Sequence, residues 1–371
     1  MDLRDFDFDL PPDLIAQDPP AKRGASRLLH LDRATGAIAH THIESLPDLL
    51  RSGDLLVVNN TKVFPARLLG RRVPSGGVVE CLLVRSQSGR DRSRTGVGPE
   101  WDRSRAGVGP EWVEEWEALM HPGQKLKPGA RVVFEGIHTV HGEVLERRFF
   151  GRRLIRLWTD DGTPIDEAVD AIGHVPLPPY INRSDRPDDR ERYQTVFART
   201  RGSVAAPTAG LHFTPSILDA LRARGIEHAE ITLHVGYGTF QPVRVERIED
   251  HRVDPERYTI GDAAAATINR ALDEQRRVIA VGTTTTRTLE AVAAENDGRI
   301  VAGAGETGLF IYPGFSFRVL SGLLTNFHLP QSSLLMLVAA FAGRARVLAA
   351  YRAAIAEQYR FYSYGDAMLI V

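Results

Sequence analysis

Two short segments bring histidines, hydroxyl groups and glycines close together, a combination suited to acid–base chemistry. Residues 203–214 read SVAAPTAGLHFT, and residues 231–243 read ITLHVGYGTFQPV. An imidazole titrates near neutral pH and can move a proton, while glycine lets the backbone adopt positive φ or approach a ligand closely. We predict that His212 and His234 are catalytic and that the small residues beside them bind substrate, namely Thr208, Gly210, Gly236, Gly238 and Thr239.

Each of these signals also has a purely structural interpretation. A single histidine among apolar residues is more often satisfied within a core than active in catalysis, and glycine-rich turns usually only turn the chain. His212 is the preferred catalyst because it follows a turn of small residues that can approach a ligand. His234 lies on a predicted strand, where its side chain can point inward.

The segment VIAVGTTTTRTLE (278–290) predicts a buried strand that leads directly into a helix. The free N–H groups of a helix start, with the hydroxyls of Thr283 and Thr284, can hold a carboxylate or a phosphate. Arg287 follows closely and offers a bidentate donor for the same anion. Capping of the helix by Thr285 or Thr286 explains the pattern without a ligand.

Further polar and aromatic residues follow predicted strands or precede prolines. The stretch DLLVVNN (54–60) predicts a buried strand whose terminal asparagines can contact a purine-like edge, although an Asx turn before Pro65 is the simpler account. In TNFHLP (325–330), the polar residues can either order the loop or bind a ligand. In YRFYSYGD (359–366), the aromatic residues can either pack in the core or stack on a base. The residues predicted to bind substrate in these groups are Asn59, Asn60, Thr61, Arg67, Asn326, His328 and Tyr364.

The apolar pattern changes along the chain and predicts two domains. Within residues 66–156, short alternating segments separated by Gly and Pro turns indicate a small β-barrel. Later segments such as SILDALRARG (216–225), with a serine suited to the N-cap, and DAAAATINRALDEQRR (262–277) indicate helices between strands. We predict an α/β fold: a discontinuous α/β catalytic domain with a mixed or parallel sheet, residues 1–65 and 157–371, and an inserted β-barrel domain, residues 66–156.

Composition excludes several classes of protein. The 371 residues carry a formal net charge of −1, and Cys81 is the only cysteine, so neither a disulfide framework nor a thiolate metal site is available. The charged N-terminus does not resemble a signal peptide, and the apolar stretch 334–343 falls short of the roughly 20 residues that span a membrane. No GxGxxG dinucleotide motif follows a predicted strand, and P-loop and HExxH motifs are absent. We expect a cytoplasmic protein without a metal.

One segment is duplicated in tandem. DRSRTGVGPEW (91–101) is followed at once by DRSRAGVGPEW (102–112), and the copies differ only at Thr95 and Ala106. Their Gly, Pro, Ser and Arg content cannot bury much apolar surface. We predict a mobile surface loop rather than an added RNA-binding arm.

Strings from one end of the chain to the other resemble the S-adenosylmethionine:tRNA ribosyltransferase-isomerase family. Two positions depart from the family pattern: Asp254 stands where a second histidine is expected after His251, and Gly308 replaces a more polar residue. Besides the two histidine segments and VIAVGTTTTRTLE, the similar strings are DFDFDLPPDLIAQDP (5–19), DLLVVNNTKVFPARLLG (54–70), GHVPLPPYINR (173–183), RYQTVFA (192–198), LFIYPGF (309–315), LLTNFHLPQSSLLMLVAAFAG (323–343) and YRFYSYGDAMLI (359–370).

The resemblance implies a reaction and its participants. Enzymes of this family move the ribosyl part of S-adenosylmethionine onto 7-aminomethyl-7-deazaguanine at the tRNA wobble position and rearrange it to epoxyqueuosine, releasing adenine and methionine. The implied co-substrate is S-adenosylmethionine, and the implied partner is a tRNA anticodon stem-loop bound by a monomer. His212 or His234 would supply a base near the ribose 5′ carbon, and Arg287 with the helix start would anchor the methionine carboxylate.

Two other classes of function remain open. A metal-dependent hydrolase could use His212, His234 and His328 as ligands, and it would contain bound zinc or iron. A noncatalytic tRNA-binding protein would use the same barrel and arginines but would never release adenine.

Overall fold

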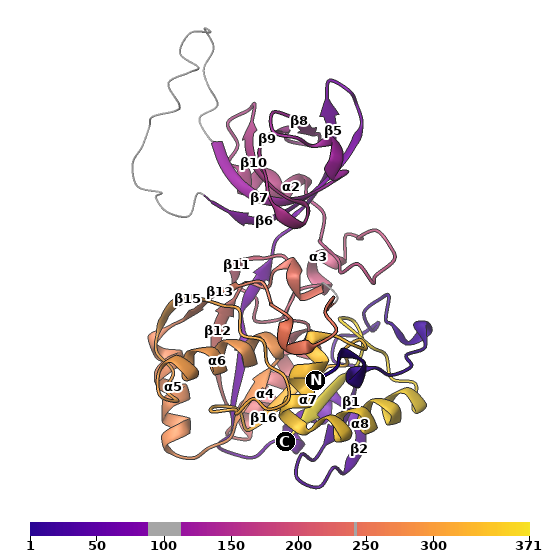
Figure 1. Cartoon of the computed structure of the whole chain (residues 1–371). Helices are drawn as coiled ribbons and strands as arrows, with labels where there is room; N and C mark the ends of the chain where they lie inside the picture. Colours follow the sequence, from indigo (N-terminus) through magenta and orange to yellow (C-terminus); the bar gives the residue numbers. More distant parts are fainter. Residues whose placement is uncertain (88–112, 241–242) are drawn as a thin grey trace. The chain divides into compact units, whose positions relative to one another are not determined.

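The computed structural model describes residues 1–87, 113–240 and 243–371, which divide into two compact units (Figure 1). The first unit comprises residues 1–62 and 177–371, and the second comprises residues 63–176. The predicted fold class is confirmed, because the chain forms a large mixed sheet with helices and a closed β-barrel. The domain boundary predicted between residues 156 and 157 falls inside a barrel strand, and the second unit continues to residue 176.

The first unit is built on a nine-stranded sheet with the order β15-β13-β12-β3-β14-β16-β17-β1-β2. β12, β3, β14 and β16 are parallel to one another, and β17 pairs antiparallel with β16 but parallel with β1. β3, β14 and β16 are buried along their whole length, as expected for parallel strands covered on both faces. The strands are β1 (Arg27–Leu31), β2 (Ile38–His42), β3 (Leu55–Asn59), β12 (Glu227–Leu233), β13 (Glu256–Ile260), β14 (Val278–Val281), β15 (Gly303–Thr307), β16 (Gly322–Asn326) and β17 (Ala367–Ile370); β4 (Thr61–Val63) and β11 (Thr200–Ser203) form a separate pair.

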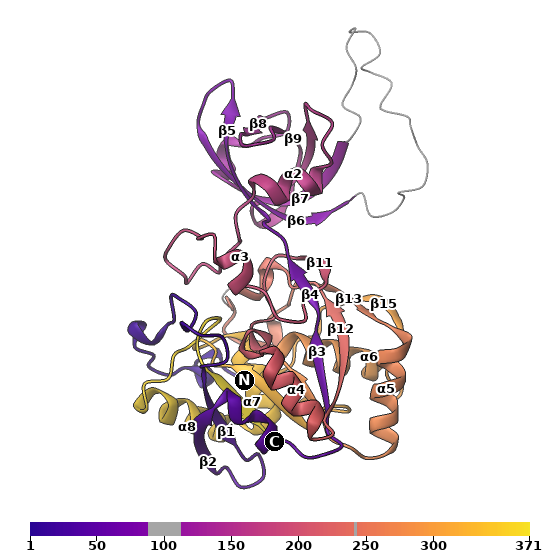
Figure 2. The same ribbon diagram turned by 180° about the vertical axis from the view of Figure 1, so that it is seen from behind.

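Helices cover both faces of this sheet because successive strand residues point to opposite sides. Leu55 and Val57 belong to an apolar cluster with residues of α5, α6, α7 and α8, whereas Leu56 and Val58 pack with residues of α1 and α4. Figure 1 shows α5, α6 and α8 in front of the sheet, and Figure 2 shows α4 in front when the molecule is turned around. The helices of this unit are α1 (Leu46–Leu49), α3 (Asp189–Arg192), α4 (Pro215–Ala223), α5 (Asp262–Asp273), α6 (Thr283–Glu295), α7 (Ser333–Ala342) and α8 (Arg344–Ala356).

The start of α4 corrects one prediction. The N-cap residue is Thr214, whose hydroxyl accepts a hydrogen bond from the backbone N–H of Ile217 at 3.2 Å. Pro215 occupies the first helical position, where its missing N–H leaves no intrahelical hydrogen bond unmade. Ser216 is therefore inside the helix and is not its cap.

One edge of the sheet collects the polar residues that the sequence singles out. The carboxyl ends of parallel strands meet at the same edge, which is where α/β proteins usually bind ligands. There Asn59 ends β3, His234 follows β12, Thr283 follows β14 and Asn326 ends β16. β17 runs antiparallel to β16, so the residues just before it, including Ser363, reach the same edge.

The second unit is a closed six-stranded antiparallel barrel with the order β10-β7-β6-β5-β8-β9. Buried and less buried residues alternate along β10, which is the period-2 pattern that predicted a barrel. Its elements are β5 (Arg67–Val73), β6 (Val78–Ser86), β7 (Val113–His121), β8 (Arg131–Phe134), β9 (Val140–Arg147), β10 (Arg152–Thr159) and α2 (Ile165–Ile172).

The tandem repeat 91–112, predicted to be a mobile loop, lies outside the described residues. Among the described residues, no single helix is long and apolar enough to cross a membrane; α7 and α8 meet the criteria of length and composition only as a pair, bent by 114°.

Candidate active site

A cavity of about 280 Å³ lies at the polar edge of the large sheet, within the first unit. This volume is close to the lower end of the range of about 300–1,000 Å³ usual for small-molecule sites. The cavity is lined by residues that follow β14 and β16, by residues that precede β17, and by the 3-10 helix η7 (Thr208–His212). Five of the predicted binding residues line it: Thr208, Thr283, Thr284, Asn326 and His328.

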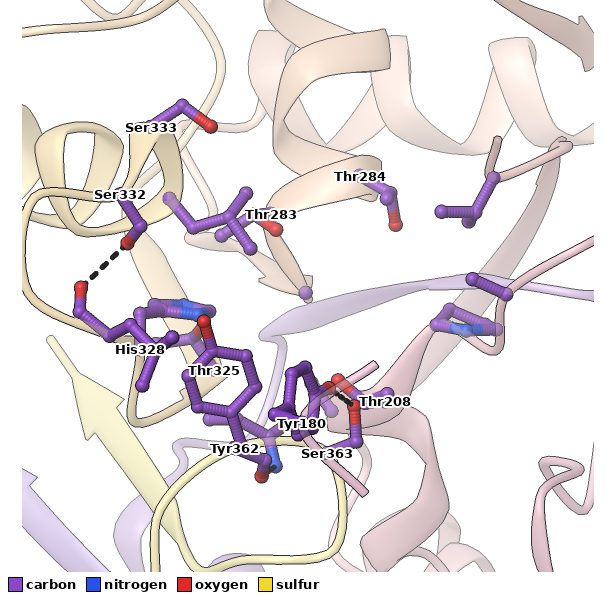
Figure 3. A pocket seen from close by; sticks show the side chains of 18 of the residues that line it. Tyr180, Thr208, Thr283, Thr284, Thr325, His328, Ser332, Ser333, Tyr362 and Ser363 are labelled. Atoms are coloured by element: carbon purple, nitrogen blue, oxygen red, sulfur yellow. Dashed lines mark hydrogen bonds between the residues drawn. The ribbon is translucent and has the colours of Figure 1, made fainter. Parts of the chain in front are cut away.

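Two helix starts converge on this cavity. α6 begins at Thr283, and α7 begins at Ser333 after its N-cap residue Ser332. Figure 3 shows these starts on one side of the cavity. The first-turn N–H groups of a helix have no intrahelical acceptor and carry the positive end of the helix dipole, so this side of the cavity suits an anionic group.

The threonines of α6 fall into two groups. The hydroxyls of Thr285, Thr286 and Thr288 donate to the carbonyl oxygens four residues earlier, at 2.8–3.1 Å. Thr284 Oγ1 is buried and has no hydrogen-bond partner among the described residues. The N-cap position belongs to Gly282, so the alternative in which Thr285 or Thr286 caps the helix is wrong.

Asn326 and His328 enter the cavity from the end of β16. Asn326 Nδ2 donates to the carbonyl of Tyr362 at 2.9 Å, and its buried Oδ1 has no partner among the described residues. His328 Nε2 lies 2.8 Å from Thr325 Oγ1, and burial lowers the pKa of the His328 imidazole to about 3. His328 is therefore neutral at physiological pH.

Tyr180 and Tyr362 form the opposite wall of the cavity (Figure 3). Their ring centroids are 3.8 Å apart and their planes are inclined at 59°. The Tyr180 hydroxyl makes a short hydrogen bond to Ser363, and burial raises the pKa of both phenols. Tyr362 has φ of 74°, a left-handed conformation that bulky residues rarely adopt and that often accompanies functional sites.

His212 lines a smaller hollow beside the cavity, and Ser363 lines both spaces. The His212 side chain is buried, and its Nδ1 lies 2.9 Å from Ser26 Oγ. Burial lowers the pKa of the imidazole to about 4, and the nearby Asn326 side chain opposes this shift. Even so, His212 Nε2 has no partner with acceptable hydrogen-bond geometry among the described residues, and the same is true of Asn326 Oδ1.

Tyr364 also lines the second hollow rather than the main cavity. Its hydroxyl donates to Asp189 Oδ1 at 2.9 Å, and Asp189 in turn pairs with Arg183 at 2.7 Å. The Tyr364 side chain is therefore fixed from behind by a buried charged group.

His234 is not among the described residues that line the main cavity. Its Nδ1 lies 2.8 Å from Thr61 Oγ1, and its ring lies so close to Gly202 that an added Cβ there would be 2.7 Å away. Burial lowers the pKa of His234 to about 4. These contacts match the structural interpretation of this histidine.

The asparagines after β3 are engaged within the protein. Asn59 Oδ1 accepts from the N–H groups of Thr61 and Leu233 at 3.1 and 3.0 Å, which is the Asx turn that the sequence allows. Asn60 Oδ1 accepts from Thr232 Oγ1 at 2.7 Å. Arg67 lies in the barrel unit and pairs with Glu80 at 2.8 Å.

Arg287 occupies a buried ion pair. Its Nη1 donates to Glu256 Oε2 at 2.6 Å and its Nε donates to the carbonyl of Leu309 at 2.9 Å. Arg287 is not among the described residues that line the main cavity, although the start of its helix is. Arg287 instead lines a separate small hollow that shares Ser333 and Leu334 with the main cavity.

Close packing, and not unusual backbone angles, accounts for two of the three predicted glycines, Gly210 and Gly238. None of Gly210, Gly236 and Gly238 has positive φ. A Cβ on Gly210 would be 2.8 Å from Phe197 and Thr195, and one on Gly238 would be 2.9 Å from Asp254. The side chain of Thr239 lies outside the part of the chain that is described.

Over residues 1–87, 113–240 and 243–371, no three His, Cys, Asp or Glu side chains are grouped closely enough to hold a metal ion. His212, His234 and His328 therefore do not form the ligand set that a metal-dependent hydrolase would need.

Comparison with known proteins identifies the family. The family model described as "Queuosine biosynthesis protein" matches residues 3–370. The chain belongs to the queuosine biosynthesis protein family.

Relatives within the queuosine biosynthesis protein family match along the whole length. The S-adenosylmethionine:tRNA ribosyltransferase-isomerases of Desulfitobacterium hafniense and Geobacter metallireducens are each 50% identical, with 100% of both chains covered. The crystal structure of an S-adenosylmethionine tRNA ribosyltransferase from Thermotoga maritima is 35% identical, covers 99% of this chain and 100% of its own, and gives a TM-score of 0.53.

The structure adds several residues of this family member to the cavity that were not predicted from its sequence. These are Asp7, Tyr180, Ser332, Ser333 and Ser363, and they line the cavity with Tyr362 of the aromatic segment 359–366. Ser332 could have been found, since Q-S-S before an apolar run is an N-cap signal. Nothing local in the sequence indicates that Asp7 or Tyr180 reaches the same place.

Proposed function

We propose that this protein transfers and isomerises the ribosyl moiety of S-adenosylmethionine onto 7-aminomethyl-7-deazaguanine at the tRNA wobble position, giving epoxyqueuosine with release of adenine and methionine. Family membership supports this function. The observation that carries it is the pair of helix starts facing one cavity beside the unpartnered Thr284 hydroxyl. In this proposal the protein acts as a cytoplasmic monomer without a metal, with S-adenosylmethionine as co-substrate and a tRNA anticodon stem-loop as partner.

The methionine part of S-adenosylmethionine is assigned to the side of the cavity where α6 and α7 start. Its carboxylate would receive hydrogen bonds from the first-turn N–H groups and from Thr284 Oγ1, which otherwise stays buried without a partner. Asp7 lines the same cavity and supplies a negative charge for the ammonium or sulfonium group. This assignment replaces Arg287, whose guanidinium is occupied by Glu256.

A ring of the substrate is assigned to the tyrosine wall. Tyr180 and Tyr362 present aromatic surface directly opposite the helix starts (Figure 3). Stacking of a base on an aromatic side chain contributes about 1–3 kcal/mol, and it tolerates any planar ring. Adenine is the ring that the same ligand would bring into this cavity.

His212 is proposed as the proton acceptor. The positive sulfonium acidifies the ribose 5′ carbon, so a neutral base nearby can remove a proton from it. His212 is neutral at pH 7 because burial lowers its pKa, and its Nε2 faces no hydrogen-bond partner among the described residues. The nearby Asn326 side chain opposes the fall in the pKa of His212 and so favours the protonated imidazole that forms.

The test is to incubate the protein with S-adenosylmethionine and tRNA carrying the precursor base, and to analyse the nucleosides by mass. We expect epoxyqueuosine and one equivalent each of free adenine and methionine. Binding of tRNA without adenine release would instead identify a noncatalytic tRNA-binding protein. Chelator treatment serves as a control and is expected to leave the rate unchanged.

A further inference from the structure

The second hollow, beside the proposed S-adenosylmethionine cavity, has a chemistry of its own. Its lining includes Arg23, Arg192, Ser26, His212 and Ser363, and no Asp or Glu is among the described residues that line it. It lies at the same sheet edge, because Ser26 directly precedes β1 and Ser363 lies shortly before β17, which is parallel to β1. The shared residue Ser363 makes the two spaces neighbours.

Arg23 and Arg192 each donate hydrogen bonds to the segment that carries the other arginine. Arg23 Nη1 and Nη2 donate to the carbonyls of Gln194 and Glu191 at 2.7 and 3.0 Å, across to the segment that carries Arg192. Arg192 in return donates to the carbonyls of Pro20 and Ala21, just before Arg23. This reciprocal arrangement fixes both guanidinium groups at the rim of the hollow before any ligand arrives.

These contacts compensate the positive charges of the two arginines only in part. Among the described residues, the hydrogen-bond partners of Arg23 and Arg192 are neutral carbonyls, whereas nearby Arg183 pairs with Asp189. Burial lowers the pKa of Arg23, and the charge of Arg192 lowers it further, with only partial relief from Glu191. Like charges held at a half-buried site attract an anion, which both relieves the repulsion and takes the remaining donors.

A buried imidazole also lines this hollow and connects it to the proposed reaction site. His212 is 4% exposed, lines this hollow, and its Nε2 has no partner among the described residues. Burial lowers the pKa of this imidazole, the Asn326 side chain opposes the shift, and the charges of Arg360 and Arg23 add to it.

We propose that Arg23 and Arg192, at the mouth of this small hollow of about 20 Å³, bind an anionic phosphodiester of the RNA strand next to the modified nucleotide. The proposal rests on the proposed function, since it takes the main cavity as the place of the reaction. A strand whose wobble base enters the cavity would bring an adjacent backbone phosphate to the neighbouring hollow. Arginine suits this task because its planar fork matches two phosphate oxygens.

The experiment measures tRNA affinity against salt concentration for the full-length protein and for Arg23→Gln and Arg192→Gln. Each lost phosphate contact should reduce the slope of log K against log salt by about 0.7, the value for single-stranded nucleic acid. We expect a loss of affinity of about 10-fold or more in each variant, the scale of one charged hydrogen bond, with S-adenosylmethionine affinity unchanged. Arg252→Gln is the matched control, because Arg252 also donates only to carbonyls in the described structure, at Glu249 and His251, but does not line this hollow.

A second experiment modifies the RNA instead of the protein, so its result does not depend on whether the variants fold. Anticodon stem-loops with one neutral methylphosphonate linkage at a time, placed around the wobble nucleotide, are bound to the wild-type protein. One position should weaken binding about 10-fold in wild type and have no additional effect in Arg23→Gln. No sensitive position, or equal sensitivity in the variant, would overturn the proposal.

Two further outcomes are decisive. The first uses inorganic phosphate as a probe in a titration of the wild-type protein and of Arg23→Gln. If Arg23→Gln loses phosphate binding but its tRNA salt slope equals that of the wild type, the site binds free phosphate and the RNA assignment is overturned. The wild-type protein is also assayed for nucleoside conversion. Absence of conversion contradicts the proposed function, whereas normal conversion with unchanged slopes contradicts only the phosphate subsite.

Discussion

Polar residues have different roles in the two halves of the sheet edge. After β3 and β12, the polar groups of Asn59, Asn60 and His234 are bonded within the protein. After β14 and β16, Thr284 Oγ1 and Asn326 Oδ1 are buried without partners among the described residues. A buried polar atom without a partner destabilises a fold by about 1–3 kcal/mol, so such atoms are expected where a ligand will satisfy them. At this sheet edge, the hydrogen-bonded groups of Asn59, Asn60 and His234 support the fold, whereas the unpartnered atoms of Thr284 and Asn326 line the cavity.

Replacement of the two candidate catalytic histidines tests this distinction most strongly. His212→Gln should lower turnover by about 10²- to 10⁴-fold, the usual contribution of a positioned base, while both substrates still bind. His234→Gln should instead lower stability, because it breaks the hydrogen bond to Thr61, and should retain activity per folded molecule. Single-turnover rates at saturating substrates and thermal unfolding measure the two effects. Equal rates in both variants and wild type would place the base elsewhere.

Replacement of Arg287 tests whether this residue stabilises the fold through its buried ion pair or binds S-adenosylmethionine. Arg287→Ala leaves Glu256 buried without its ion-pair partner, and breaking such a pair typically destabilises a protein by about 3–5 kcal/mol. S-adenosylmethionine affinity of the folded fraction should change little. Denaturant unfolding and calorimetry separate the two effects. Weak S-adenosylmethionine binding at normal stability would restore Arg287 as the carboxylate anchor.

Acid should destabilise the protein through its buried histidines. An unfolded histidine titrates near pH 6.5, whereas burial lowers the pKa of His212 to about 4 and that of His328 to about 3. Stability is therefore full above pH 6.5 and is lost as the pH falls towards 4, by up to about 3 kcal/mol for His212. Unfolding free energies between pH 7 and 4.5 measure the slope. The slope should be shallower in His328→Gln, and a pH-independent stability would contradict the assigned burial.

The smallest effects are expected for Thr284 and its neighbour Thr285, which serves as a matched control. Thr284→Val removes an unpartnered hydroxyl, so stability should hold or rise while S-adenosylmethionine affinity falls by about 1 kcal/mol. Thr285→Val removes a hydrogen bond to the carbonyl of Val281, so stability should fall by about 1 kcal/mol at unchanged affinity. Calorimetry and thermal unfolding give both quantities. The reverse pattern would remove Thr284 from the proposed site.

Part of the lining of the candidate site could be predicted from local pattern alone. The buried strand at 278–281 followed directly by a helix identified the α6 start, and the small-residue turn before His212 identified η7. Both rely on short-range rules, in which apolar runs form buried strands and the residues after them reach the sheet edge. Arg287 was misplaced for the same reason, since its partner Glu256 is 31 residues away and leaves no local signal.

The sequence by itself determined the α/β class, the barrel strands and which residue types stand at strand ends, because periodicity and turn residues act within a few positions. Only the tertiary structure decided which of those residues keep a polar atom free. The hydrogen-bond partners of Asn59 and Asn326 come from distant strands and loops: the Nδ2 groups donate to the carbonyls of Leu233 and Tyr362. Hydrogen-bond saturation is thus a property of packing between remote segments, and it is this property that distinguishes the proposed site from its structural support.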